Sequence, residues 1–258
     1  MNRVFITGAS SGIGAALARE YAAQGAYLGL VARRAEVLAE LAAGLPHPER
    51  HTVYALDVTD FAALGAAARD FIARHGGADI VIASAGVSAG TLTEHPEDQQ
   101  VFDAILRINL SATVATFAPF IACMKTQASP CRLVGIGSVA GIRGLPGAGA
   151  YSASKAAVLS YCESLRLELK PYGIAVVTIA PGYIATPMTE KNAYPMPFLM
   201  APERFAAAAA RAIAGGASYR VIPWQMGVVA KLLRALPNWL YDLAFARVPH
   251  KARQGSER

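Results

Sequence analysis

The turn that most constrains the chain reads Gly8-Ala9-Ser10-Ser11-Gly12-Ile13-Gly14. It follows the short apolar run of residues 3–7 and precedes a helical pattern over residues 15–24. N–H groups at a helix start, assisted by the helix dipole, bind phosphate, and glycine lets a ligand approach the backbone closely. We therefore expect a pyrophosphate cradle rather than an ordinary strand-to-helix turn. The expected cradle residues are Gly8, Ser10, Ser11, Gly12, Ile13 and Gly14.

From the run before this turn onward, apolar runs alternate with helical patterns through six rounds. The expected strands lie at 3–7, 27–32, 51–58, 78–84, 132–137 and 174–179. Such alternation predicts an α/β fold, a Rossmann-like doubly wound parallel sheet with helices on both faces. We expect one domain: a core over 1–190, a substrate lid with the last helix and strand over 187–222, and an amphipathic helical extension over 223–258. Ligands of such sheets bind at the carboxyl ends of the strands.

Composition narrows the class of protein. Of 258 residues 54% are hydrophobic, enough for a core between two helical layers. The three cysteines show no CxxC spacing, which favours neither a disulfide framework nor a metal site and suits the cytoplasm. The net charge of +6 suits an anionic ligand, but no basic run interleaved with aromatics predicts nucleic-acid binding. Polar residues and prolines interrupt the uncharged runs 108–124 and 171–189, so we predict no membrane span.

The end of the second expected strand indicates which dinucleotide binds. In dinucleotide folds this position meets the adenosine ribose, where an acid accepts from the 2′-hydroxyl. Here no acid occurs between residues 27 and 35, and Arg33 and Arg34 stand there instead. A guanidinium matches a phosphate with a planar donor fork, so we expect NADP(H) in preference to NAD(H). The alternative is two surface arginines at a helix start.

A possible proton-transfer group lies in the stretch Tyr151-Ser-Ala-Ser-Lys155. Residues four apart share one helix face, and a cation beside a phenol lowers the phenol pKa. A tyrosine tuned in this way can exchange a proton near neutral pH. Ser138 ends a buried apolar run upstream. Taken alone, a tyrosine and a lysine at this spacing also occur by chance in many helices.

At these positions the sequence resembles the short-chain dehydrogenase/reductase family over roughly residues 3–190. The residues that carry the resemblance are Thr7-Gly-Ala-Ser-Ser-Gly-Ile-Gly14, Asp57-Val58, Ser84-Ala85-Gly86, Asn109, Ser138, Tyr151, Lys155, and Pro181-Gly182 with Thr186. The resemblance implies hydride transfer between a nicotinamide and a carbonyl or alcohol carbon. One departure is Ser84, where the family usually has asparagine. The lost amide should slightly weaken packing of the central strands.

The resemblance also implies roles for single residues. Tyr151 would exchange the proton with the substrate oxygen, and Ser138 would donate a hydrogen bond to it. Lys155 would hold the nicotinamide ribose and lower the tyrosine pKa. Asn109 would anchor a water in a proton relay, although a satisfied core amide is the alternative. The remaining expected cofactor contacts are Asp57, Val58, Ala85, Gly86, Pro181, Gly182, Ile184 and Thr186.

Beyond Thr186 the family pattern fades. Met188, Met196 and Met200 lie in the expected lid and suit an apolar, adaptable pocket, or they pack the lid onto the body. The tail carries Trp224, Trp239 and nearby cations. Such a pattern is typical of an interfacial helix at a membrane surface, or of a helix packed on the domain or on a second subunit.

These observations predict an NADP(H)-dependent oxidoreductase of an apolar carbonyl or secondary alcohol, with no metal. The alternatives are a silent NADP(H)-sensing protein and a peripheral membrane reductase of lipid-like ketones. The family resemblance further suggests a homodimer or homotetramer built on the helices around Asn109 and Tyr151. The sequence names neither the substrate nor the physiological direction.

Overall fold

The computed structural model describes residues 1–190, 192, 195–246, 251 and 253. Its centre is a seven-stranded sheet in which every neighbouring pair is parallel. Both faces of the central strands are buried, which is why those strands read as nearly continuous apolar runs. The strands are β1 Arg3–Thr7, β2 Tyr27–Ala32, β3 His51–Ala55, β4 Ile80–Ala83, β5 Arg132–Ile136, β6 Ala175–Pro181 and β7 Tyr219–Ile222.

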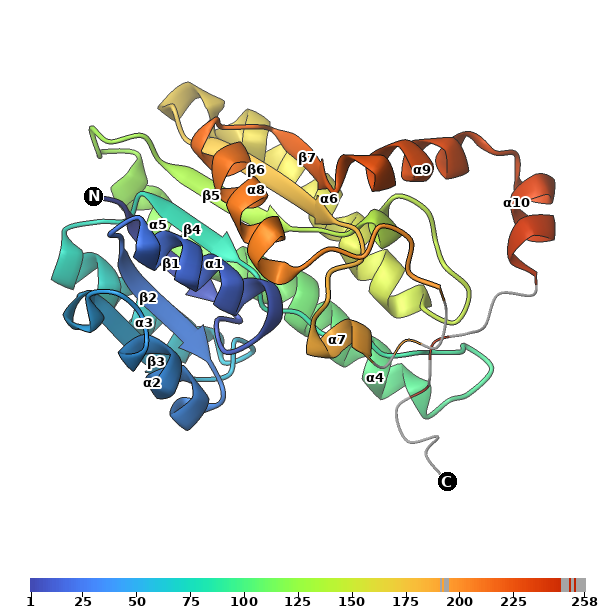
Figure 1. Ribbon diagram of the computed structural model, residues 1–258, viewed down its shortest axis with the longest axis horizontal. Coiled ribbons are helices and arrows are strands. Elements are labelled where there is room, and N and C mark those ends of the chain that lie inside the picture. The colour runs from blue at the N-terminus through green and yellow to red at the C-terminus, as the bar shows by residue number, and fades with distance from the viewer. Residues whose placement is uncertain (191, 193–194, 247–250, 252, 254–258) are drawn as a thin grey trace.

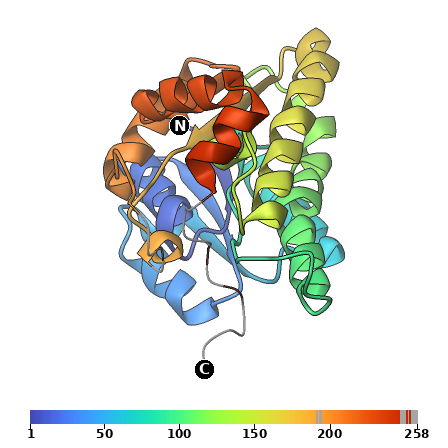
Figure 2. The same cartoon turned by 90° about the vertical axis from the view of Figure 1, so that its right-hand side faces the viewer.

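Helices cover both faces of the sheet, as Figures 1 and 2 show. One hydrophobic cluster packs α1 Gly12–Ala23, α2 Ala35–Ala43 and α8 Pro202–Ala214 against one face. A second cluster packs α3 Phe61–His75, α5 Ala112–Met124 and α6 Gly149–Leu169 against the other. The predicted doubly wound α/β fold is therefore confirmed.

The strand order is β3-β2-β1-β4-β5-β6-β7. From β1 the chain moves outward to β2 and β3, then returns across the sheet to β4 on the other side of β1. The loops after β1 and β4 therefore leave the carboxyl edge in opposite directions, which opens a crevice there. The glycine-rich turn enters this crevice directly from β1.

A long helical segment precedes β5. It consists of α4 Asp98–Leu106, a π-helical turn η2 Arg107–Ser111, and α5. Within the described residues this segment, Asp98–Met124, is the one helix long and apolar enough to cross a membrane by length and composition. Core helices satisfy the same criterion, and part of this one packs into the second cluster, through Phe117 and Phe120.

Most expected strand bounds differ from the structure by a few residues, and two differences matter most, the end of β3 and the division of the tail. β3 ends at Ala55, so Asp57 and Val58 lie in the following loop, which carries them to the crevice. β7 is the last strand expected within 187–222, and it joins the sheet beside β6. The tail forms two helices, α9 Trp224–Ala235 and α10 Asn238–Phe245, because Pro237 separates them. The short α7 Pro187–Glu190 begins the lid, and the limits of the three segments proposed from the sequence stay a prediction.

Candidate active site

The glycine-rich turn forms a tight cradle at the start of α1. Gly8 has a φ of +72°, and a Cβ placed there would lie 2.7 Å from the Cα of Ala85. A Cβ on Gly14 would overlap the carbonyl oxygen of Gly8. The Thr7 hydroxyl accepts hydrogen bonds from the amides of Ser84 and Ala85, at 3.2 and 3.3 Å, which fixes the turn against β4. The turn therefore exposes bare backbone at the amino end of a helix, the arrangement that binds phosphate.

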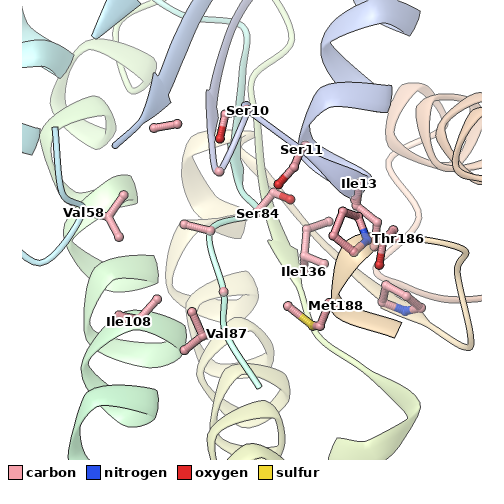
Figure 3. A pocket seen from close by; sticks show the side chains of 18 of the residues that line it. Ser10, Ser11, Ile13, Val58, Ser84, Val87, Ile108, Ile136, Thr186 and Met188 are labelled. Carbon is pink, nitrogen blue, oxygen red and sulfur yellow. The ribbon is translucent and has the colours of Figure 1, made fainter. Parts of the chain in front are cut away.

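A cleft of about 320 Å³ runs from this cradle across the carboxyl edge of the sheet. Figure 3 shows it between Val58 after β3 and Thr186 after β6, with Ser10, Ser11 and Ile13 above. All eighteen of the cofactor contacts expected from the sequence line this one cleft. Sequence reasoning did not assign to the cofactor site Ala32, Leu56, Ser84, Val87, Ile108, Ile136, Gly137, Pro187, Met188 and Thr189.

Two kinds of residue among these show what the sequence pattern can and cannot indicate. Ala32, Ile136 and Gly137 lie at the ends of β2 and β5, where the strand pattern alone could have pointed to them. Ile108 reaches the cleft from the π-helical turn, which leaves no mark in the hydrophobic pattern.

The two arginines after β2 occupy different surroundings at one end of the cleft. Arg34 donates from Nη2 to the carbonyl oxygen of Ser10 at 3.3 Å and to its hydroxyl at 3.1 Å. Arg33 is 70% exposed, and its Nη1 lies 3.9 Å from Oδ2 of Asp57. The amide of Thr59 and, more weakly, Arg33 lower the pKa of Asp57, so this carboxyl is ionised near neutral pH. Arg34 thus supports the cradle, while Arg33 leaves its guanidinium available to an anion.

Ser138, Tyr151 and Lys155 meet at the other end of the cleft. Ser138 follows β5, and its hydroxyl hydrogen-bonds Tyr151 and accepts from the amide of Ala140 at 3.1 Å. α6 presents Tyr151 and Lys155 on one face, as the spacing predicts. The Lys155 ammonium donates to the carbonyl oxygen of Ile136 at 2.8 Å and lies 6.0 Å from the centre of the Tyr151 ring. The three groups predicted to act together are therefore neighbours.

The protonation of this cluster differs from the expectation. Burial raises the pKa of Tyr151, and the hydrogen bond from Ser138 offsets this only in part. Burial also lowers the pKa of Lys155 to about 8. We expected Lys155 to lower the pKa of the Tyr151 phenol, and these side chains by themselves do not produce that shift. Desolvation by burial is the largest cause of both shifts.

Asn109 lies outside the cleft lining, fully buried in the π-helical turn. Its Oδ1 accepts from the amide of Val87 at 2.9 Å, and its Nδ2 donates to the carbonyl oxygen of Val87 and to the Ser154 hydroxyl. Three protein partners satisfy the amide and tie η2 both to the loop after β4 and to α6. The core-amide alternative is thus realised in these contacts, and the role in a proton relay stays a prediction.

A second, smaller cavity of about 80 Å³ adjoins the cleft and shares Ser138 and Tyr151 with it. Val139, Leu145 and Met188 give it an apolar wall. Of the three lid methionines, only Met188 lines either cavity. Met200 packs against the first hydrophobic cluster. The polar lining residues are Ser88, Tyr183, Thr189, Asn192 and Lys251.

Neither the cysteines nor the carboxylates of the described residues form a second reactive centre. Cys123, Cys131 and Cys162 are free thiols, and burial raises the pKa of each. In the part of the chain that the structure describes, no group of three or more His, Cys, Asp or Glu side chains could hold a metal ion.

Comparisons with known proteins agree with this geometry. The family model described as short chain dehydrogenase matches residues 2–195. An uncharacterized oxidoreductase of Myxococcus xanthus is 36% identical over 248 residues, which cover 94% of this chain and 96% of the relative. A 2-dehydro-3-deoxy-L-rhamnonate dehydrogenase (NAD(+)) of Sphingomonas is 35% identical over 188 residues, 72% of this chain and 73% of that protein.

Two solved structures resemble the fold closely. A short-chain dehydrogenase from Streptomyces avermitilis superposes with a TM-score of 0.80 at 25% identity, over 95% of this chain and 98% of that one. A 3-ketoacyl-(acyl-carrier-protein) reductase from Brucella melitensis, complexed with NADH, superposes with a TM-score of 0.76 at 26% identity. That superposition covers 86% of this chain and 96% of the reductase.

Proposed function

The chain belongs to the short-chain dehydrogenase family, and from that premise we propose that it is an NADP(H)-dependent oxidoreductase of carbonyl compounds or secondary alcohols. The Myxococcus relative is named as an oxidoreductase, the Sphingomonas relative as an NAD(+) dehydrogenase, and the Brucella reductase is complexed with NADH, in line with the nicotinamide cofactor of this family. The observation that carries the proposal is the position of Ser138, Tyr151 and Lys155. All three line the cleft, and Ser138 and Tyr151 also line the second cavity, so a cofactor in the cleft and a substrate in the cavity would meet at the Tyr151 hydroxyl.

The cleft suits a dinucleotide on its own features. The cradle has no side chains where Gly8 and Gly14 pass close to neighbouring backbone, and α1 has no acid in its first turn to repel a phosphate. Ile184 and Thr186 line the opposite end, where they would hold the nicotinamide amide. When bound, the nicotinamide supplies or accepts the hydride.

The protein groups would handle the proton and the developing charge. In reduction, Tyr151 would donate its phenolic proton to the substrate oxygen while Ser138 donates a hydrogen bond to the same oxygen. The raised pKa of Tyr151 keeps the phenol protonated before the reaction. Lys155 would hold the ribose of the bound cofactor. The positive charge of an oxidised nicotinamide, or the ribose hydroxyls, would then stabilise the phenolate of Tyr151, which the protein side chains alone do not do.

For the cofactor, Arg33 favours NADP(H), because its exposed guanidinium stands at the ribose end of the cleft with no acid preceding it on β2. Asp57 is the nearest carboxylate described there, and Arg33 pairs with it only at 3.9 Å. A bound 2′-phosphate would give Arg33 a closer counter-charge than Asp57 does.

The test is a turnover assay with NADPH and a panel of ketones and aldehydes, followed by absorbance. We expect oxidation of NADPH with at least one carbonyl, and its loss in Tyr151→Phe while NADPH binding persists. Tight NADPH binding with no turnover in either protein would favour a cofactor-sensing role instead. A Tyr151→Phe variant as active as the parent would refute the assigned proton donor.

One surface favours an additional membrane contact. Trp224, Val228 and Leu232 form an exposed apolar stripe along α9, and Trp239 and Leu243 are likewise exposed on α10. If the stripe binds lipid, the protein should sediment with anionic liposomes, and the double variant Trp239→Ser, Leu243→Ser should stay in the supernatant. A parent protein that never sediments would leave subunit packing as the use of this stripe.

We also expect a homodimer or homotetramer that buries α4, α5 and α6. Leu167 on α6 is 59% exposed and Val114 on α5 is 37% exposed, so both offer apolar area to a second copy. Sedimentation-velocity analysis should give a dimer or tetramer, and Leu167→Glu should shift it toward the monomer. A parent protein that is monomeric at micromolar concentration would contradict this expectation.

A further inference from the structure

A lysine from the end of the chain lies in the cavity that adjoins the catalytic cluster. Lys251 lines the second cavity together with Ser138 and Tyr151. Its ammonium donates to the Ser88 hydroxyl at 2.8 Å and stands 5.9 Å from the centre of the Tyr151 ring. Ser88 follows β4 in the loop beyond Gly86, so the contact joins segments 163 residues apart. In an oxidoreductase with the function proposed above, this position faces the substrate.

An ion pair two residues further along holds the lysine there. Arg253 binds Asp98 in a two-pronged pair, Nε to Oδ2 at 2.9 Å and Nη2 to Oδ1 at 3.0 Å. The Asp98 side chain is only 5% exposed, and its Oδ2 also accepts from the amide of Leu92 at 2.8 Å. Arg253 additionally contacts Glu97 at 2.9 Å and bridges Gly90 through its backbone. A bidentate pair with a buried, already hydrogen-bonded carboxylate fixes position as well as charge.

Lys251 lacks a counter-charge within the described residues. No carboxylate lines the second cavity, and no ion pair to Lys251 occurs in the described part of the chain. An ammonium has three donors, and the Ser88 hydroxyl uses one of them. Lys155, the nearest other charged group of the catalytic cluster, is also a cation when protonated. A half-buried cation with free donors and no anion is unfavourable by itself, and becomes favourable when a ligand brings the anion.

We propose that Lys251 binds a carboxylate of the substrate, and that the Arg253–Asp98 pair positions it for this role. The substrate would then be an oxo acid in one direction and the matching hydroxy acid in the other. Val139, Leu145 and Met188 would contact the hydrocarbon part between the carboxylate and the reacting carbon. This refines the apolar substrate expected from the lid methionines, since an apolar wall and one cation share a cavity of about 80 Å³. That volume favours a compact acid.

The experiment compares acids with their uncharged esters. The probes are 2-oxopentanoate, 4-oxopentanoate and 5-oxohexanoate, each beside its methyl ester, with NADPH and the full-length enzyme. The readout is the ratio of kcat/KM for the best acid to kcat/KM for its ester. We expect this ratio to exceed one in the parent and to fall about 10- to 100-fold in Lys251→Met, as for loss of a charged hydrogen bond. Lys251→Arg should retain most of it.

Two further variants distinguish the effect of the position of Lys251 from the general effect of removing a positive charge. Arg253→Gln releases the pair with Asp98 and should lower the same ratio, mainly through KM, while leaving Lys251 in the chain. Lys170→Met removes an exposed charge after α6 and should leave the ratio unchanged. Circular dichroism checks that each variant is folded. An acid-to-ester ratio at or below one in the parent, or an unchanged ratio in Lys251→Met, would overturn the proposal. An unchanged ratio in Arg253→Gln would overturn the positioning role.

A binding measurement distinguishes failure of this inference from failure of the proposed function. Calorimetric titration of 4-oxopentanoate and of its ester into the enzyme with NADP+, which cannot reduce either compound, measures binding without turnover. Tighter binding of the acid that disappears in Lys251→Met would support the lysine site even if no compound is reduced, and the oxidoreductase proposal alone would then fail. Equal binding of acid and ester, with turnover of both, would refute the role of Lys251 and leave the oxidoreductase proposal standing.

Discussion

Replacing Arg33 by alanine should weaken binding of NADPH far more than binding of NADH. Arg33 is 70% exposed and holds Asp57 only at 3.9 Å, so its removal costs the protein little and leaves the cradle intact. A charged hydrogen bond contributes about 1.5–3 kcal/mol, and solvent exposure places this one at the lower end. About 1.5 kcal/mol corresponds to roughly a tenfold rise in the NADPH Kd. Asp57, then unpaired, would face the 2′-phosphate and add to the loss.

Arg34 provides the contrast. Its guanidinium donates to the Ser10 carbonyl and hydroxyl, so Arg34→Ala should loosen the cradle and weaken both cofactors. Titrations of both reduced cofactors, followed by their fluorescence, give the dissociation constants of the parent and of each variant, with Arg69→Ala on α3 as the exposed control. The Arg33 effect should shrink at high salt, because the site is open to solvent. Equal losses for NADPH and NADH in Arg33→Ala would refute the preference for NADP(H).

Three other changes test the energetics of the site. Gly14→Ala should abolish cofactor binding and lower the melting temperature, because the new Cβ would overlap the Gly8 carbonyl. Gly149→Ala is the control, because a Cβ at that position has no atom within 4 Å, and it should leave both cofactor binding and the melting temperature unchanged. Burial lowers the Lys155 pKa from 10.5 to about 8, so the unfolded chain binds the proton more tightly and stability rises between those pH values. Without cofactor, Lys155→Met should therefore have a larger free energy of unfolding than the parent near pH 7, by up to about 3 kcal/mol in denaturant titrations. A difference in free energy of unfolding that does not narrow toward pH 10 would contradict the lowered pKa of Lys155. Arg143→Ala should free α9 and α10, because Arg143 donates to the Leu236 carbonyl at 2.7 Å and its guanidinium lies 3.9 Å from the centre of the Tyr241 ring. Limited proteolysis should then cleave after residue 223, and cleavage no faster than in the parent would contradict the contact.

The sequence predicted features that depend on local pattern. The glycine turn after β1 and the helical spacing of Tyr151 and Lys155 each follow from neighbours within one turn or one strand. One topological rule, that ligands bind at the carboxyl edge of a parallel sheet, predicted that the glycine turn and the Tyr151–Lys155 stretch would line the same site. Asp57 lines the cleft even though β3 is shorter than expected, because it lies only two residues beyond the end of that strand.

The features that sequence reasoning missed depend on long-range contacts. The hydrogen bonds of Asn109 join η2 to segments 22 and 45 residues away, and no local pattern names those partners. The pKa of Tyr151 depends on how deeply the folded chain buries two groups, so spacing alone gave the wrong direction for the isolated protein. Lys251 enters the site from a tail whose composition gave no sign of a role there.

The contacts of Arg143 with the C-terminal helices limit which segments can be exchanged between related proteins. Arg143 lies in the loop between Ser138 and Tyr151, inside the stretch that matches the family model, while its partners Leu236 and Tyr241 lie beyond that stretch. The Tyr241 hydroxyl returns the contact by donating to the Gly144 carbonyl at 2.6 Å. A chimera that swaps the tail to alter substrate choice must therefore carry the 138–150 loop with it, since either half grafted alone would face a mismatched surface.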